Sequence, residues 1–288
     1  MLDFYLAYQS LISFVGVNAL LALSVYATLS CGQLSLANAG FMAIGAYTAA
    51  LLTLHAPAVP FLLVLAASAL VPALLAVPLG LPVLRLRGVF LAIATIGFGE
   101  VIRIGFVNWD YTNGALGLVA IPQRTRPWIL WLTVALALYV LGRLRGSRTG
   151  YALEAIREDE TAARSMGIET TAYKLGMFAL GAAIAGLAGA LEAHFTFMVS
   201  PAGFGFGRVV DMLVQAVVGG TAAFFGPVVG AAFLTVLPEA MREVGSRLGL
   251  SPGPFRMFLD GAILLAVILY LPNGLVSLPR KLFTRRRA

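Results

Sequence analysis

The most restrictive feature of this chain is the stretch from residue 4 to residue 84, which contains no Asp, Glu, Lys or Arg. A membrane-spanning helix needs about 20 predominantly apolar residues, so a stretch of this length predicts three spans joined by tight turns. Gly32 and Gln33 mark the first break between spans, and Pro57 and Pro60 mark the second.

Composition extends this interpretation to the whole chain. Of 288 residues, 60% are hydrophobic and only 11% are charged, and the mean hydropathy is +0.91. Soluble domains are nearer half apolar and about a quarter charged, so a soluble or disordered protein is excluded. We expect an all-α, polytopic membrane protein that forms one transmembrane domain over residues 1–288. About eight to nine hydrophobic segments, some short or broken, are expected; they lie at 8–29, 36–54, 58–84, 88–107, 128–141 (a short one), 173–197, 208–242 (two spans if the first is short) and 255–271.

The basic residues predict the orientation of the spans. Cytoplasmic loops favour Lys and Arg, and the net charge of +7 fits that preference better than a nucleic-acid partner, so the expected surroundings are membrane lipid. With the C-terminus inside, the loop 143–174 is cytoplasmic and the N-terminus is outside. This frame places thirteen of the 20 basic residues inside: Arg85, Arg87, Arg143, Arg145, Arg148, Arg157, Arg164, Lys174, Arg280, Lys281, Arg285, Arg286 and Arg287.

Two glycine-rich stretches, 32–40 and 219–227, interrupt the hydrophobic pattern. Inside lipid, interrupted helices occur only where protein or a water-filled cavity covers the backbone. Paired interruptions in the two halves of a transporter point to a translocation site, although small residues also simply let helices pack closely. The candidate pathway-lining residues are Gln33, Ser35, Asn38, Thr95, Gln215 and Thr221.

Charged side chains within the spans predict one intramembrane ion pair. Glu100 and Arg103 lie three residues apart on one helical face, and charges at this depth usually pair or face the bundle interior. A structural pair and a pathway element both remain open. Arg208 is close enough in sequence to pair with Asp211, and His194 is expected at the membrane interface.

Catalytic and metal-binding patterns are missing from the sequence. Two histidines and one cysteine do not make a convincing metal site. The chain also lacks the Gly-x-x-x-x-Gly-Lys-Ser/Thr loop that holds nucleotide phosphates. We therefore expect no enzymatic activity and no cofactor bound by this chain.

The cytoplasmic loop contains the most informative hydrophilic sequence. Asp159 can cap a short helix, and Gly167 can end it in a left-handed conformation. Ala162, Ala163 and Met166 then form a small apolar stripe on that helix. Such a helix suits docking into a groove of another protein, and the alternative is a surface helix that only connects two spans.

This loop resembles the coupling segment of bacterial ABC-importer permeases, whose pattern is Glu-Ala-Ala, three residues and Gly. Residues 161–167 fit the pattern, with Thr161 in place of the Glu. The resemblance implies that an ATPase couples to the chain through Thr161, Ala162, Ala163, Met166 and Gly167.

Further stretches carry a second resemblance. They are Gly32-Gln33-Leu34-Ser35-Leu36, Gly45-Ala46-Tyr47, Leu86-Arg87-Gly88-Val89-Phe90 with Glu100 and Arg103, Asn113-Gly114, Val218-Gly219-Gly220, Gly226-Pro227 and Pro272-Asn273-Gly274-Leu275. Over about residues 15–276 the chain resembles the LivM-type branched-chain amino-acid permeases. It departs from that pattern at Ala37-Asn38, where Gly-His is more usual.

The resemblance implies one of the two permease subunits of an ATP-driven importer in the bacterial inner membrane. Its partners would be a LivH-type permease, two ATPase subunits that bind ATP and Mg²⁺ on the cytoplasmic side, and a periplasmic or lipid-anchored binding protein. The substrates would be branched-chain or other small hydrophobic amino acids, but related permeases move urea or short amides. The alternative is an ion-coupled secondary transporter or channel, which has no need of a docking helix.

Overall fold

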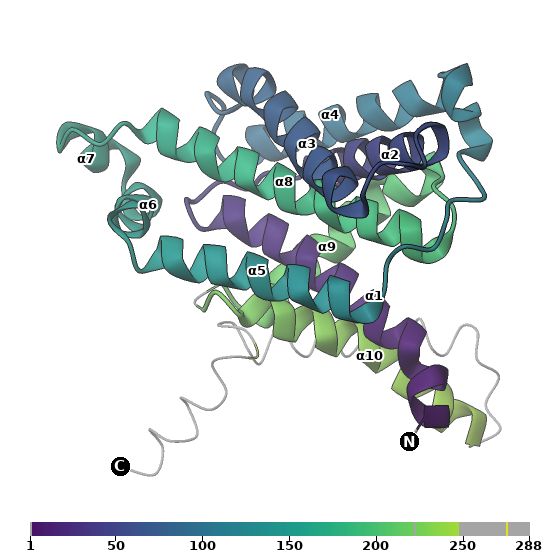
Figure 1. Cartoon of the computed structure of the whole chain (residues 1–288). Helices are drawn as coiled ribbons and strands as arrows, with labels where there is room; N and C mark the ends of the chain where they lie inside the picture. Colours follow the sequence, from purple (N-terminus) through teal and green to yellow (C-terminus); the bar gives the residue numbers. More distant parts are fainter. Residues whose placement is uncertain (1, 222, 248–274, 276–288) are drawn as a thin grey trace, which may run out of the picture.

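The computed structural model describes residues 2–221, 223–247 and 275, and Figure 1 shows their arrangement. Five of the described helices are long and apolar enough to cross a membrane: α1, α3, α4, α5 and α8. The chain is thus an all-helical, multi-pass membrane protein, as its composition predicts. The expected span at 255–271 and the basic tail from Arg280 lie outside the described residues. The elements are α1 (Leu2–Leu29), α2 (Asn38–His55), α3 (Phe61–Val83), α4 (Val89–Val107), η1 (Asp110–Thr112), η2 (Gly114–Leu116), α5 (Pro127–Arg145), α6 (Arg148–Glu158), α7 (Glu160–Ser165), α8 (Thr170–Thr196), η3 (Pro201–Phe204), α9 (Phe206–Gly219) and α10 (Gly226–Arg247).

Helix α8 forms the centre of the bundle. It packs against α1, α2 and α3, and Figure 1 shows it running between α2 and α3 on one side and α1 on the other. Small residues allow this close approach, because a Cβ on Gly45 of α2 would collide with Gly186 of α8, and one on Gly189 would collide with Met42. The rings of Phe41 and Phe178 fill the adjoining space, so α2 is held firmly against α8.

The peripheral helices α3, α4 and α5 present apolar side chains outward. In the most apolar stretch of each of these helices, only 28%, 22% and 22% is buried, against 78% in α1. Leu62, Phe90 and Leu132 are 77%, 74% and 61% exposed. A contiguous apolar surface of this extent suits hydrocarbon rather than water, so these helices form a lipid-facing side.

Both expected breaks are present. Helix α1 ends at Leu29 and α2 begins at Asn38, with Gly32 in the left-handed region at φ +75°. Helix α9 ends at Gly219 after only 14 residues, and α10 begins at Gly226. A Cβ on either of these two glycines would collide with the backbone across the turn, so the turn requires glycine at both places.

Helix α5 is longer than the short segment expected at 128–141. It covers 19 residues, Pro127–Arg145, and its last turn carries Arg143 and Arg145. Basic side chains at a helix C-terminus are favoured by the helix dipole, so the helix continues past the apolar run on which the shorter estimate was based.

Of the segments that charge predicts to be cytoplasmic, residues 85–87 and the loop 143–174 lie together at one end of the bundle. Figure 1 shows α6 and α7 at that end. The turn between α3 and α4 reaches the same place, because Arg87 lies 3.7 Å from Glu160 of α7. The opposite end contains the loop before α5, where Arg124 donates hydrogen bonds to the carbonyl oxygens of Pro57 and Val59.

Candidate functional site

Polar side chains from three helices stabilise the break between α1 and α2. Thr95 of α4 is fully buried, and its hydroxyl oxygen accepts a hydrogen bond from the Leu36 backbone N–H at 2.9 Å. The Asn38 amide donates to Ser24 Oγ of α1 at 2.8 Å. Non-helical backbone at membrane depth needs such partners, and these contacts explain how the interruption is tolerated.

Four of the six candidate pathway residues gather at this break. Gln33, Ser35, Asn38 and Thr95 are each at most 3% exposed. The Cys31 thiol lies 3.4 Å from Gln33 Oε1, and Gln33 borders a small pocket of about 140 Å³. In this structure the four side chains fix the broken segment, and Gln33 also borders open space.

Gln215 and Thr221, the other two candidates, lie at the second break. The backbone carbonyl of Gln215 lies close to Gly230 of α10. Its side-chain Oε1 is buried and has no hydrogen-bond partner among the described residues. Thr221 lines a larger pocket of about 920 Å³. The structure therefore divides the six candidates between two breaks instead of collecting them in one site.

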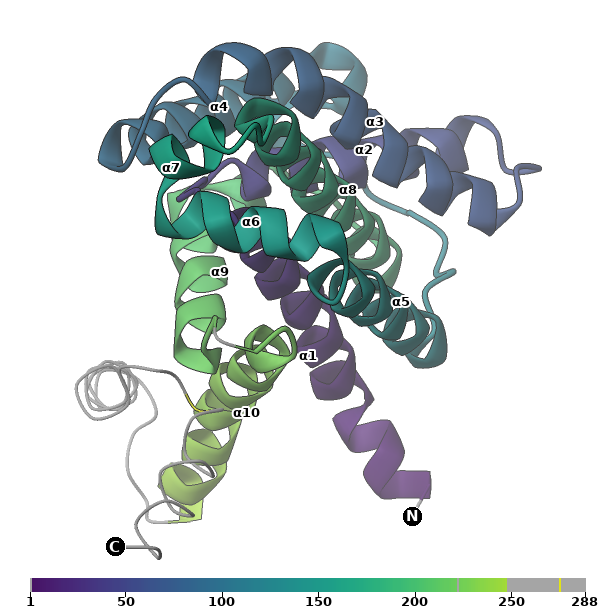
Figure 2. The same cartoon turned by 90° about the vertical axis from the view of Figure 1, so that its left-hand side faces the viewer.

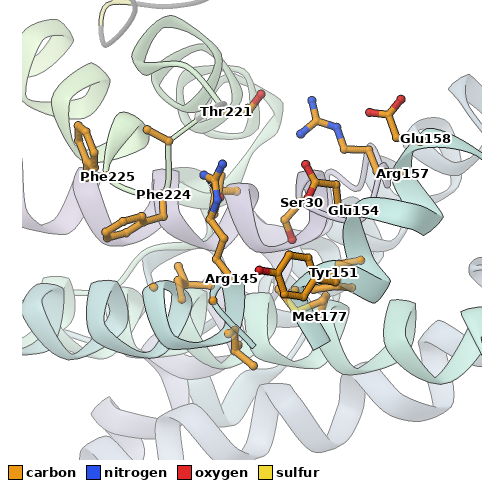
Figure 3. Close-up of a pocket in the computed structure, with 18 residues that line it drawn as sticks. Ser30, Arg145, Tyr151, Glu154, Arg157, Glu158, Met177, Thr221, Phe224 and Phe225 are labelled. Carbon is orange, nitrogen blue, oxygen red and sulfur yellow. Dashed lines mark hydrogen bonds between the residues drawn. The ribbon is translucent and has the colours of Figure 1, made fainter. Parts of the chain in front are cut away.

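The larger pocket brings the two breaks together. Its lining includes Ser30, which follows α1, and Thr221, which follows α9. Helices α5 and α6 contribute charged side chains, and Figure 3 shows the Arg145 guanidinium and the Glu154 carboxylate at the edge of this space. Arg145 also reaches the Tyr26 hydroxyl at 3.5 Å. The pocket is thus a charged opening at the end of the bundle that carries α6.

Helix α7 has the caps that the sequence predicts. The Asp159 carboxylate accepts two backbone N–H hydrogen bonds from its first turn. At the other end Gly167 has φ +83°, and the Ile168 N–H donates to the Ala163 carbonyl oxygen. This is the Schellman motif, so the six-residue helix is capped at both ends.

The apolar stripe expected on α7 is partly exposed and partly buried. Thr161 and Ala162 are exposed, and Met166 is 83% exposed. Ala163 is only 4% exposed, because it faces the rest of the chain. The expectation that Ala163 lies on the outward face is therefore wrong. The surface that α7 offers to a partner consists of Thr161, Ala162 and Met166, ended by Gly167.

One carboxylate attaches α7 to the bundle. Glu160 Oε2 accepts a hydrogen bond from Lys174 Nζ of α8 at 2.7 Å and lies 3.7 Å from Arg87 Nε. Its Oε1 lies 3.2 Å from Arg164 Nη2 and accepts a hydrogen bond from the Thr170 hydroxyl at 3.3 Å. Burial alone would raise the pKa of Glu160. The hydrogen bond and charge of Lys174, aided by the neighbouring groups, outweigh burial and hold that pKa below its usual value.

This cluster adjoins the first break. The small pocket is lined by Glu160 together with Gln33. A Cβ on Gly32 would stand 3.4 Å from the Arg157 Cα, so α6 also touches the broken segment. Sequence reasoning missed the role of Glu160. The available signal was its spacing of four residues from Arg164, which predicts a helical pair but not the link to α8.

Two further ion pairs lie on the long helices. Arg103 donates to Glu100 at 2.7 Å, as their spacing predicts, and both side chains are about one-third exposed. Arg208 donates to Glu192 of α8 at 2.6 Å. The expected pair of Arg208 with Asp211 is therefore wrong, because the guanidinium reaches across to the less exposed carboxylate on α8, which needs a counter-charge more.

His194 is fully buried and lies two residues before the end of α8 at Thr196. Its Nδ1 lies 2.9 Å from the Ala190 carbonyl oxygen and its Nε2 lies 2.9 Å from Thr53 Oγ1, so the ring joins α8 to α2. Within the part of the chain that the structure describes, no three His, Cys, Asp or Glu side chains are grouped so that they could hold a metal ion.

Comparison with known proteins gives several related permeases. The high-affinity branched-chain amino acid transport system permease protein LivM of Salmonella typhimurium is 35% identical, over 92% of this chain and 67% of that protein. LivM of Escherichia coli is 34% identical with the same coverage. LivH of Salmonella typhimurium is 32% identical over 64% of this chain and 58% of that protein.

A more distant relative is the autoinducer 2 import system permease protein LsrC of Shigella flexneri, 28% identical over 62% of this chain and 54% of that protein. No solved structure matches the chain. Residues 7–268 match the model of the family described as branched-chain amino acid transport system, permease component. With this match and the identity to LivM, the chain belongs to the branched-chain amino acid transport permease family.

Proposed function

We propose that this chain is a permease subunit of an ATP-driven importer and forms half of the translocation pathway for branched-chain or other small hydrophobic amino acids. The observation that carries the proposal is α7, a short helix capped at both ends that exposes Thr161, Ala162 and Met166. Glu160 attaches this helix to α8 at the centre of the bundle. A carrier that works alone has no use for an exposed helix connected in this way. The names of the LivM relatives support the substrate class.

The proposal divides the work between subunits. The exposed face of α7 docks into a groove of an ATPase subunit, one for each permease, and the ATPases bind ATP and Mg²⁺. This chain binds no cofactor and catalyses no reaction. A LivH-type permease completes the pathway, and a periplasmic or lipid-anchored binding protein delivers substrate from outside. The loop 143–174 and the C-terminus are then cytoplasmic and the N-terminus is outside, in the bacterial inner membrane.

The contacts suggest how ATPase movement reaches the pathway. A displacement of α7 passes through the Glu160–Lys174 pair into α8. Helix α8 packs on α2, so the displacement acts on the segment between α1 and α2. That segment and the second break both border the pocket of about 920 Å³, which serves in this proposal as the cytoplasmic opening.

The test is reconstitution of the chain with a LivH-type permease and the two ATPases in proteoliposomes, with binding protein and radiolabelled leucine. We expect uptake that requires ATP hydrolysis and persists when ionophores collapse the ion gradients. As a matched pair, Met166→Asp, on the exposed face of α7, should abolish stimulation of the ATPases, whereas Glu169→Gln, in the exposed loop before α8, should not. Uptake by the chain without ATPases, driven by an ion gradient, would contradict the proposal. Uptake of urea or short amides without leucine would contradict the substrate class.

A further inference from the structure

One face of α9 is not covered by the rest of the described chain. The helix packs against α1, α10 and η3, and Figure 2 shows it at the edge of the bundle next to α10. Phe206, Val210 and Val217 on its other side are 54%, 38% and 48% exposed, and Asp211 is exposed at the edge of that side, about 100° or more around the helix from each of them. The apolar residues of this face are compatible with lipid, but the carboxylate is not.

Helix α8 is long and apolar enough to cross a membrane, and from the distance to its end we place Asp211 within the membrane-spanning part of the protein. Its neighbour Arg208 is bonded to Glu192, which is four residues before the end of α8 at Thr196. Arg208 is therefore about one helical turn inside that end of the bundle. Asp211 lies three residues further along α9, about 4.5 Å deeper at 1.5 Å per residue. From there α9 continues to Gly219, beside the segment that lines the larger pocket.

The carboxylate of Asp211 lacks a partner among the residues that the structure describes. The charge of Arg208 acts on Asp211, but its guanidinium is bonded to Glu192. Charged side chains at membrane depth are costly against lipid and face a water-filled cavity or another protein. The exposed face of α9 must therefore border water, protein or both.

We propose that this face of α9 lines a water-filled translocation pathway whose opposite wall is the second permease subunit, and that the Asp211 carboxylate binds the ammonium group of the passing amino acid. The inference rests on the proposed function. A second permease is the occupant because Salmonella typhimurium has two distinct permease proteins, LivM and LivH, with the same transport-system description, and this chain is similar to both.

The chemistry of the face fits a branched-chain amino acid. Such a substrate presents one cation, one anion and an aliphatic side chain. Helix α9 presents one unpaired carboxylate at Asp211, and Val214 lies three residues further along on the same face. The Arg208 guanidinium is paired with Glu192, so Asp211 presents the exposed carboxylate of this helix, and that carboxylate selects for the ammonium group.

Accessibility to water is the first test. Asp211→Cys and Val214→Cys are made separately and treated, in the assembled complex, with a membrane-impermeant sulfonated methanethiosulfonate, at rest and during ATP-driven uptake. The second variant keeps the carboxylate. Native Cys31 is 1% exposed and gives an inert background, and Leu70→Cys, at a 60% exposed position of α3, is the lipid-facing control.

We expect both α9 cysteines to react in at least one of the two conditions and the α3 cysteine to remain unmodified. If both α9 cysteines are as inert as the control, the proposal is overturned. Lipid or a tightly packed protein segment then covers this face.

Transport is the second test. We expect Asp211→Asn to reduce leucine uptake at least tenfold while subunit assembly and ATP hydrolysis stay at wild-type level, and Asp211→Glu to transport within threefold of wild type. Glu169→Gln, a carboxylate removed from an exposed loop, is the matched control and should transport normally. Uptake by Asp211→Asn within twofold of wild type overturns the role of the carboxylate. If the wild-type complex itself shows no ATP-driven uptake, the proposed function fails. The accessibility test still decides whether the exposed face of α9 is in contact with water.

Discussion

The link between α7 and α8 gives the sharpest prediction on stability. Glu160→Gln keeps the size of the side chain and removes its charge. Lys174 is then left with an uncompensated ammonium group at an 11% exposed position. Arg87 and Arg164 lose the same partner, but they are 68% and 61% exposed and remain solvated. The cost of the substitution therefore comes almost entirely from Lys174.

The magnitude follows from the burial of this pair. Removing one member of a fully buried ion pair costs about 3–5 kcal/mol. Glu160 is 18% exposed, and a glutamine amide oxygen still accepts a hydrogen bond from Lys174. We therefore expect a loss of about 2 kcal/mol in the free energy of unfolding, with exposed arginines contributing less than about 1 kcal/mol each. By the scaling for chains of roughly this size, the melting temperature falls by about 4–8 °C.

The assay is thermal unfolding in detergent micelles, followed with a thiol-reactive fluorophore. Cys31 is buried and lines the same small pocket as Glu160, so it reports opening at this place. Glu169→Gln is the matched control, and as a surface substitution it should stay within about 0.5 kcal/mol of wild type. The double variant Glu160→Gln with Lys174→Met should lose less than the sum of the single variants, because it leaves no unpaired charge. Additive losses, or an equal shift in the control, would refute the reasoning.

The pH dependence of the same pair has a defined sign. The pKa of Glu160 is lower in the folded chain than its ordinary value, so its contribution to stability is fully present above the unfolded pKa of about 4.3. That contribution is lost as the pH falls through the folded pKa. The melting curves of wild type and Glu160→Gln should therefore differ at neutral pH and converge at pH values below the folded pKa.

Three other changes test single contacts, each followed by folded yield in size-exclusion chromatography. Ala163→Leu overpacks a buried site and should cost about 1–3 kcal/mol. Ala162→Leu adds the same bulk on the exposed face, so yield should be unchanged while stimulation of the ATPases is lost; equal yields for the two would contradict the burial of Ala163. Glu100→Gln and Arg103→Gln should each lower yield more than their combination, since the double variant leaves no unpaired charge. Gly45→Val forces a branched side chain into the backbone of α8 and should abolish folded chain, whereas a normal yield would show that α2 and α8 can separate.

The features that the sequence predicts correctly depend on residues that are close together in the chain. The spans follow from runs of apolar residues, and the breaks follow from glycines. Asp159 caps the helix that begins one residue later, and Gly167 ends it. The pair of Glu100 with Arg103 needs only the helical repeat. In each case local propensity and the final structure agree.

The features that the sequence predicts wrongly or misses depend on which helices meet. Arg208 could pair with either of two carboxylates, and only the position of α8 beside it selects Glu192. The contact of the His194 ring with Thr53 of α2 is not predicted by the sequence at all. Ala163 is buried because of the position of α7 against the bundle, which the hydrophobic pattern of six residues cannot indicate. Long-range packing decides all three.

The same packing indicates which parts of the permease move together. Helices α2 and α8 are joined near their middle by the contact of Gly45 with Gly186 and near their far ends by the hydrogen bond of Thr53 with His194. A displacement that enters α8 at its first turn must therefore carry α2 with it. Between α2 and α1 lies a non-helical segment that contains Gly32 at a positive φ, and hinges are short segments of this kind. Helix α9 packs mainly on α1 and α10. The ion pair of Glu192 with Arg208 joins α8 to α9, and α8 also packs on α1, so we expect a displacement of α8 to reach the helix that carries Asp211.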